Sequence, residues 1–135
     1  MFSSDDHAYM SQALQLAEKG LYTTSPNPRV GCVIVRDGKI AGSGWHVQTG
    51  QPHAEINALS IAGGSAQGAT VYLTLEPCSH YGVTAPCTNA IIDSKISEVI
   101  YSIKDIDKRV RGKTKSILSK KNIIVKTGLL SNKIS

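Results

Sequence analysis

Strand and helix patterns alternate along the second half of this 135-residue chain, after a β-hairpin pattern in the first half. Residues 30–36 are rich in β-branched side chains, Asp37-Gly38 is a two-residue turn signal, and residues 40–45 supply a partner strand. Strands separated by helices pair in parallel, whereas a hairpin joins antiparallel strands. The chain is therefore predicted to form one mixed sheet with helices on both faces, a three-layer α/β/α sandwich.

Apolar spacing and capping residues predict the individual elements. A first helix is expected from Asp5 to Gly20, with Asp5 or Asp6 as its cap. A second helix is expected over residues 53–62, between Pro52 and the pair Gly63-Gly64. The other expected elements are strands at residues 70–75, 98–103 and 122–126, helices at 87–94 and 113–120, and a loop at 77–86.

Length and composition are typical of one globular domain, and we expect a single domain over residues 1–135. With 41% hydrophobic and 19% charged residues the chain is not of the disordered class. No apolar run approaches the ~18 residues that span a bilayer, so no membrane partner is expected. The N-terminus lacks a basic region followed by an apolar one, and a cytoplasmic location is expected.

Charge is distributed unevenly along the chain. Residues 1–93 hold four basic and seven acidic side chains, net −3, whereas residues 94–135 hold eleven basic and three acidic side chains, net +8. Such a basic segment is typical of an anion-binding or nucleic-acid-binding face, or of a solvated lysine-rich surface. Tyr101 is its only aromatic residue, so the stacking platforms of a single-strand binder are missing and the sequence does not favour a nucleic-acid partner.

A metal-ligand pattern joins the starts of two expected helices. His53 and Glu55 lie at the start of one, and Cys78 and Cys87 precede or begin the other. One imidazole and two thiolates suit zinc, and three protein ligands leave a fourth position for water, as in catalytic zinc sites. Glu55 is then placed to take a proton from that water and deliver it to a leaving group. The sequence predicts a catalytic Zn²⁺ site with ligands His53, Cys78 and Cys87 and with Glu55 as the catalytic residue.

The third cysteine, Cys32, lies in the first predicted strand. An odd number of cysteines without an export signal does not favour a disulfide framework. We expect Cys32 to be a small buried residue and chemically inert.

The H-x-E and P-C elements are the signature of zinc nucleobase deaminases, in which activated water attacks an amino-bearing ring carbon. Eight residues separate Cys78 from Cys87, where the common version has two. With the segments TSPNPRVGCV (24–33) and TLEPCSHYG (74–82), the chain resembles the deaminase domain of bifunctional riboflavin-biosynthesis enzymes, the diaminohydroxyphosphoribosylaminopyrimidine deaminases. The resemblance covers residues 5–105 and weakens after them.

The resemblance implies a cytidine-deaminase-like fold and hydrolytic removal of the 2-amino group from 2,5-diamino-6-(5-phosphoribosylamino)pyrimidin-4-one, a small phosphorylated pyrimidine. It also implies three substrate contacts: Asn27 with the pyrimidine, His46 near the substrate, and Asp105 with the ribosyl part. A homo-oligomer is implied as well. Because no reductase domain is recognised in the 135 residues, the NADPH-dependent reduction that follows would need a separate protein.

The chain departs from the family pattern at one informative position. Val83 stands where the family usually has a lysine or arginine that helps to hold the substrate. Basic residues between Lys104 and Lys113 are candidates to supply the missing charge to the phosphate.

Two other functions remain open on the sequence. A nucleic-acid or nucleoside base deaminase, acting on tRNA adenosine or on cytosine, shares the zinc chemistry, but the eight-residue cysteine spacing argues against it. A catalytically idle partner subunit would explain Val83, but the intact Glu55 argues against that function.

Overall fold

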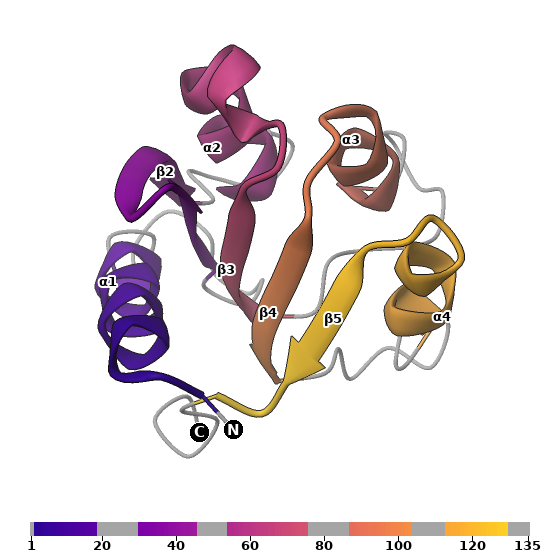
Figure 1. Cartoon of the computed structure of the whole chain (residues 1–135). Helices are drawn as coiled ribbons and strands as arrows, with labels where there is room; N and C mark the ends of the chain where they lie inside the picture. Colours follow the sequence, from indigo (N-terminus) through magenta and orange to yellow (C-terminus); the bar gives the residue numbers. More distant parts are fainter. Residues whose placement is uncertain (1, 19–29, 46–53, 76–86, 104–112, 130–135) are drawn as a thin grey trace.

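The computed structural model describes residues 2–18, 30–45, 54–75, 87–103 and 113–129. Within these residues the strands form one five-stranded sheet in the order β2-β1-β3-β4-β5 (Figure 1). The strands are β1 (Gly31–Arg36), β2 (Lys39–Trp45), β3 (Thr70–Leu75), β4 (Glu98–Ile103) and β5 (Ile124–Thr127). Strand β1 is antiparallel to β2 and β3, while β3, β4 and β5 run parallel. The predicted mixed sheet is confirmed.

The described helices also follow the predicted order. They are α1 (Ser4–Glu18), α2 (Ala54–Ala62), the 3₁₀ turn η1 (Gly63–Ala66), α3 (Cys87–Asp93) and α4 (Lys113–Ser119). The sequence analysis did not predict η1, and it started β5 two residues too early, because Asn122 adopts a turn conformation with φ of +63°. Among the described helices none is long and apolar enough to cross a membrane.

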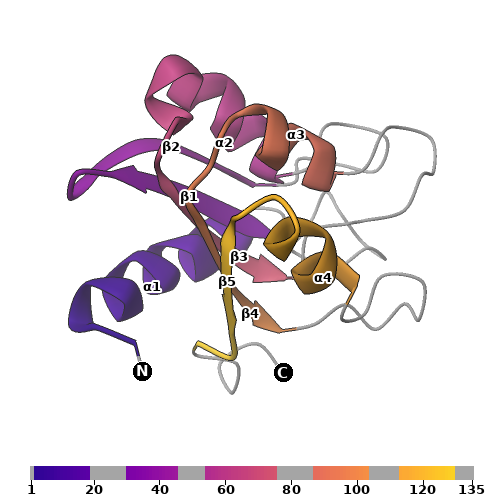
Figure 2. The same ribbon diagram turned by 45° about the vertical axis from the view of Figure 1, so that its right-hand side comes forward.

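Helices cover both faces of the sheet, as predicted. Helix α1 packs on one face, in a buried cluster made of Met10, Ala13, Val33, Val35, Tyr72, Ile100 and Leu129. Helices α2, α3 and α4 contribute Ala58, Ile91 and Leu118 to the cluster on the other face. Figures 1 and 2 show α1 alone on its side of the sheet and the other three helices opposite it. The three-layer sandwich is therefore confirmed.

The turn between β1 and β2 has the conformation that its residues predict. Asp37 and Gly38 both have positive φ, 53° and 76°. A two-residue hairpin turn with positive φ at both positions matches the right-handed twist of the flanking strands. The hairpin is thereby determined by local residues alone.

The start of α1 corrects one prediction. Ser3, rather than Asp5 or Asp6, caps this helix: the Asp6 backbone N–H donates to Ser3 Oγ at 3.0 Å. The Ser3 backbone N–H in turn donates to Asp6 Oδ2, also at 3.0 Å. This reciprocal pair is a capping box, in which the serine hydroxyl and a carboxylate three residues later satisfy each other's backbone donors. The cap uses one carboxylate oxygen of Asp6, Oδ2, so the other oxygen, Oδ1, can accept a hydrogen bond from the sheet.

Tyr72 of β3 donates a hydrogen bond from its hydroxyl to Asp6 Oδ1, at 2.6 Å, and so ties α1 to the sheet. Partial burial by itself raises the pKa of Asp6, but the hydrogen bonds from Tyr72 and Ser3 hold it below its usual value. Burial, followed by the bond to Asp6, raises the pKa of Tyr72. At neutral pH the pair is therefore a neutral phenol donating to a carboxylate.

Replacing Tyr72 with phenylalanine is expected to lower the free energy of unfolding by about 1–2 kcal/mol at pH 6, because a hydrogen bond to a charged acceptor is lost. A carboxylate with a depressed pKa contributes stability above its unfolded pKa and loses that contribution as pH falls through the folded pKa. The difference between the two proteins should thus shrink below about pH 4. Urea unfolding at pH 6 and pH 3 measures it, and a constant difference would contradict the prediction.

Candidate active site

One edge of the sheet gathers the ends of β2, β3 and β4 and the starts of α2, α3 and α4. The last residues of β3 and β4, Leu75 and Ile103, are register partners, and Trp45 at the end of β2 pairs with Gly31 at the start of β1. Figure 2 shows β3 and β4 pointing to the side on which α2, α3 and α4 begin. We call this the carboxyl edge; in open α/β sheets it is where ligands bind.

Most of the predicted site residues belong to segments that join this edge in the sequence. Each follows the end of β2, β3 or β4, or precedes the start of β1, in a segment outside the described residues: Asn27, His46, His53, Cys78 and Asp105. The structure describes the strand and helix ends that border these segments in the sequence. The zinc and substrate roles of these five residues stay predictions.

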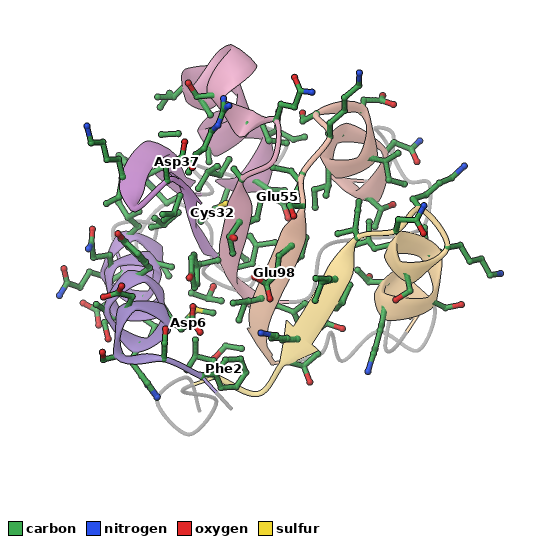
Figure 3. The ribbon with its side chains drawn as sticks, viewed as in Figure 1. Phe2, Asp6, Cys32, Asp37, Glu55 and Glu98 are labelled. Carbon is green, nitrogen blue, oxygen red and sulfur yellow. The ribbon has the colours of Figure 1, made fainter. Side chains whose placement is uncertain are left out.

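Glu55 is placed by the structure. It lies in the first turn of α2 and is buried, with 4% of its surface exposed. Figure 3 shows its side chain in the layer between the helices and the sheet. The partial positive charge at a helix N-terminus favours a carboxylate in the first turn. Burying a carboxylate otherwise costs free energy, so a buried glutamate at the carboxyl edge is a candidate for chemistry.

Small residues let α2 lie directly on β2. Ala54, Ala58 and Ala62 recur every four residues and are all buried. Below them, a Cβ on Gly44 would come within 2.9 Å of the Ala54 carbonyl oxygen, and a Cβ on Gly42 within 2.3 Å of the Ala58 carbonyl oxygen. The absence of side chains at these two strand positions brings the first turn of α2, and with it Glu55, down to the sheet.

Two side-chain hydrogen bonds join strand ends at the carboxyl edge. Asn57 Nδ2 donates to the carbonyl oxygen of Trp45 at 2.9 Å, which links α2 to the end of β2. The Gly31 backbone N–H donates to Thr74 Oγ1 at 3.1 Å, which links the start of β1 to the end of β3. Thr74 is buried, so bulk water does not compete with the Gly31 N–H for its hydroxyl oxygen. The sequence analysis predicted a role for neither Asn57 nor Thr74. For Asn57, the polar side chain within the apolar pattern of α2 was a usable signal.

Cys32 of β1 lies beneath α2 and is fully buried, as predicted. Burial and, second, the nearby charge of Glu55 raise the pKa of its thiol well above the usual value. A thiol that stays protonated is a poor nucleophile and a poor metal ligand. The structure thus supports a packing role for Cys32.

Cys87 is the first residue of α3, and His53 precedes the first residue of α2 in the sequence. The two helices contact each other and begin at the same edge. One imidazole and two thiolates are the nitrogen and sulfur donors that Zn²⁺ prefers. The chemistry of this predicted donor set therefore fits a zinc ion.

Comparison with known proteins shows the family of this chain. The family model for the cytidine and deoxycytidylate deaminase zinc-binding region matches residues 3–103. A diaminohydroxyphosphoribosylaminopyrimidine deaminase of Buchnera aphidicola subsp. Schizaphis graminum is 55% identical over 126 residues, which cover 93% of this chain and 86% of that protein. Riboflavin biosynthesis protein RibD of Escherichia coli K12 is 50% identical over 93% of this chain.

The solved structure of Acinetobacter baumannii RibD, form 1, superposes with a TM-score of 0.92 at 48% identity and covers 95% of this chain. The match covers 36% of that chain and 34% of the Escherichia coli protein, so this chain spans about a third of the RibD relatives. It covers most of the Buchnera deaminase. The chain belongs to the zinc-binding cytidine and deoxycytidylate deaminase family and, within it, to the diaminohydroxyphosphoribosylaminopyrimidine deaminases.

Proposed function

We propose that this chain catalyses the hydrolytic deamination of 2,5-diamino-6-(5-phosphoribosylamino)pyrimidin-4-one in riboflavin biosynthesis, with release of ammonia. The observation that carries the proposal is the buried carboxylate of Glu55 in the first turn of α2, at the carboxyl edge. The 55% identity to a deaminase of that name supports the substrate.

In the proposed site His53, Cys78 and Cys87 bind Zn²⁺, which, when bound, supplies a nucleophile at neutral pH by lowering the pKa of water to about 7. Glu55 accepts a proton from the attacking water. It donates that proton to the ring nitrogen, then takes the second proton from the hydroxyl group added to the ring carbon and passes it to the departing amine, so that ammonia leaves as a neutral molecule. The burial of Glu55 excludes bulk water from this proton relay.

Substrate binding is assigned to residues that flank the carboxyl edge in the sequence. Asn27 contacts the pyrimidine, His46 lies near the substrate, and Asp105 holds the ribosyl part. With Val83 in place of a basic residue, the phosphate is held by basic residues between Lys104 and Lys113.

We further propose that residues 1–135 form a single deaminase domain that works in the cytoplasm as a homo-oligomer. The name of a Thermotoga maritima relative, a deaminase and 5-amino-6-(5-phosphoribosylamino)uracil reductase, supports a phosphoribosylamino pyrimidine as the substrate.

Ammonia release by purified protein of known zinc content tests the proposed function. The expected result is turnover of the diaminopyrimidinone ribosyl phosphate, with no ammonia from cytidine or from an adenosine-containing tRNA stem-loop. Turnover of the stem-loop would instead assign the basic segment 94–135 to nucleic-acid binding. One zinc per chain without turnover of any of the three compounds would indicate the idle partner subunit.

A further inference from the structure

Asn57 lies on α2 two residues after Glu55. Its side-chain amide donates to the carbonyl oxygen of Trp45 at 2.9 Å, and Trp45 is the last residue of β2. The bond therefore runs from the helix that carries the catalytic carboxylate to the strand end at the carboxyl edge. Asn57 and Glu55 share one short rigid helix, so whatever orients one residue orients the other.

Small residues also make close contacts between α2 and β2. Buried Ala54 and Ala58 lie over Gly42 and Gly44, with backbone atoms of the helix close to each glycine. Apolar packing of this kind is non-directional. It sets the distance between helix and strand. A hydrogen bond, in contrast, requires a defined donor-acceptor distance and angle.

We propose that Asn57 is a positioning residue for Glu55: its hydrogen bond to Trp45 sets the rotation and axial position of α2 on β2, and thereby the position of the carboxylate. This inference rests on the proposed function of Glu55. Proton transfer needs the carboxylate within hydrogen-bond reach of the water and of the ring nitrogen. A displacement of about 1 Å at such a group can lower a rate by up to about 100-fold.

Two substitutions test the role of the bond. Asn57→Ala removes the side-chain amide, and Asn57→Asp keeps its size but places an oxygen against the Trp45 carbonyl. In both variants kcat for the diaminopyrimidinone is expected to fall about tenfold, while KM changes less than about twofold, because the loss concerns a group that acts in the transition state. Zinc content should stay at the level of the parent protein.

Ser60→Ala is the matched control. Ser60 lies on the same helix, is exposed, and lines the same surface hollow as Asn57. This variant is expected to keep the parent kcat and KM. Equal losses of kcat in Ser60→Ala, or an Asn57→Asp protein with the parent kcat, would overturn the proposal. A raised KM with unchanged kcat would overturn it too, since that pattern indicates a role in substrate binding.

Hydrogen exchange of the backbone amides of residues 54–59 gives a readout that needs no activity. Exchange is expected to be faster in both Asn57 variants than in the parent and in Ser60→Ala, because the first turns of α2 lose their anchor to β2. Unchanged exchange would contradict the positioning role. If the parent protein does not turn over the diaminopyrimidinone, the proposed function fails, while the exchange comparison still decides whether Asn57 anchors the helix.

Discussion

Replacing Glu55 with glutamine is expected to lower kcat for ammonia release by about 10³-fold, within the range that general acid-base groups contribute. Glutamine has nearly the same shape and keeps the buried position, but it cannot take up and return a proton. Zinc binding and proton transfer are separate tasks, so one zinc per chain should remain. Steady-state ammonia release and metal analysis on the same sample measure both quantities.

Glu98→Gln is the control for this substitution. Glu98 lies at the start of β4, at the opposite end of that strand from the carboxyl edge, and its carboxylate is 3.1 Å from Lys126 Nζ. Loss of this partly exposed ion pair is expected to cost at most about 1 kcal/mol of stability and to leave activity unchanged. If Glu55→Gln kept more than about a tenth of the activity, which is far above the loss expected for a general acid-base group, Glu55 would not be the proton shuttle.

Replacing Gly31 with alanine is expected to lower the free energy of unfolding by about 3 kcal/mol, at the upper end of the range for overpacked sites. A Cβ at this position would lie 1.9 Å from the Ala13 carbonyl oxygen and 2.7 Å from the Ala17 backbone nitrogen. Both are backbone atoms of α1, so no side-chain rotation relieves the clash. The helix must move off β1, which opens the apolar layer around Met10. Urea unfolding measures the loss.

Gly64→Ala separates this effect from the general preference for alanine over glycine. Gly64 lies in η1, and nothing lies within 4 Å of a Cβ built on it. Its replacement should leave stability unchanged or raise it by up to about 1 kcal/mol, through the smaller entropy of the unfolded chain. Equal stability of the two variants would show that α1 and β1 accommodate a methyl group and would contradict the close packing at Gly31.

The elements that sequence analysis predicted best are those that depend on near neighbours. The Asp37-Gly38 turn needs positive φ at two consecutive positions, and these residues accept it. Strands β3 and β4 have the predicted bounds because each is a short run rich in β-branched and aromatic residues. The cap of α1 was predicted at the wrong residue, because Ser3 and Asp6 act as a reciprocal pair, whereas the prediction considered each aspartate alone.

In the candidate site, too, the sequence predicted some features and carried no signal for others. Residue types and spacing predicted the zinc chemistry and the role of Glu55, because imidazole, thiolate and carboxylate groups have intrinsic properties that do not depend on the fold. Spacing carried no information about Asn57 or Thr74. Their hydrogen bonds reach Trp45 and Gly31, which are 12 and 43 residues away in the sequence.

The sequence by itself determined the mixed α/β architecture, the order of its elements and the chemistry of the proposed metal site, since these follow from local backbone preference and side-chain type. Only the tertiary structure decided that α1 is the one described helix on its face of the sheet, that the strand glycines admit helices to near backbone contact, and that Glu55 is buried at the carboxyl edge. Those features depend on where distant backbone segments pass one another, and packing of the whole chain settles that.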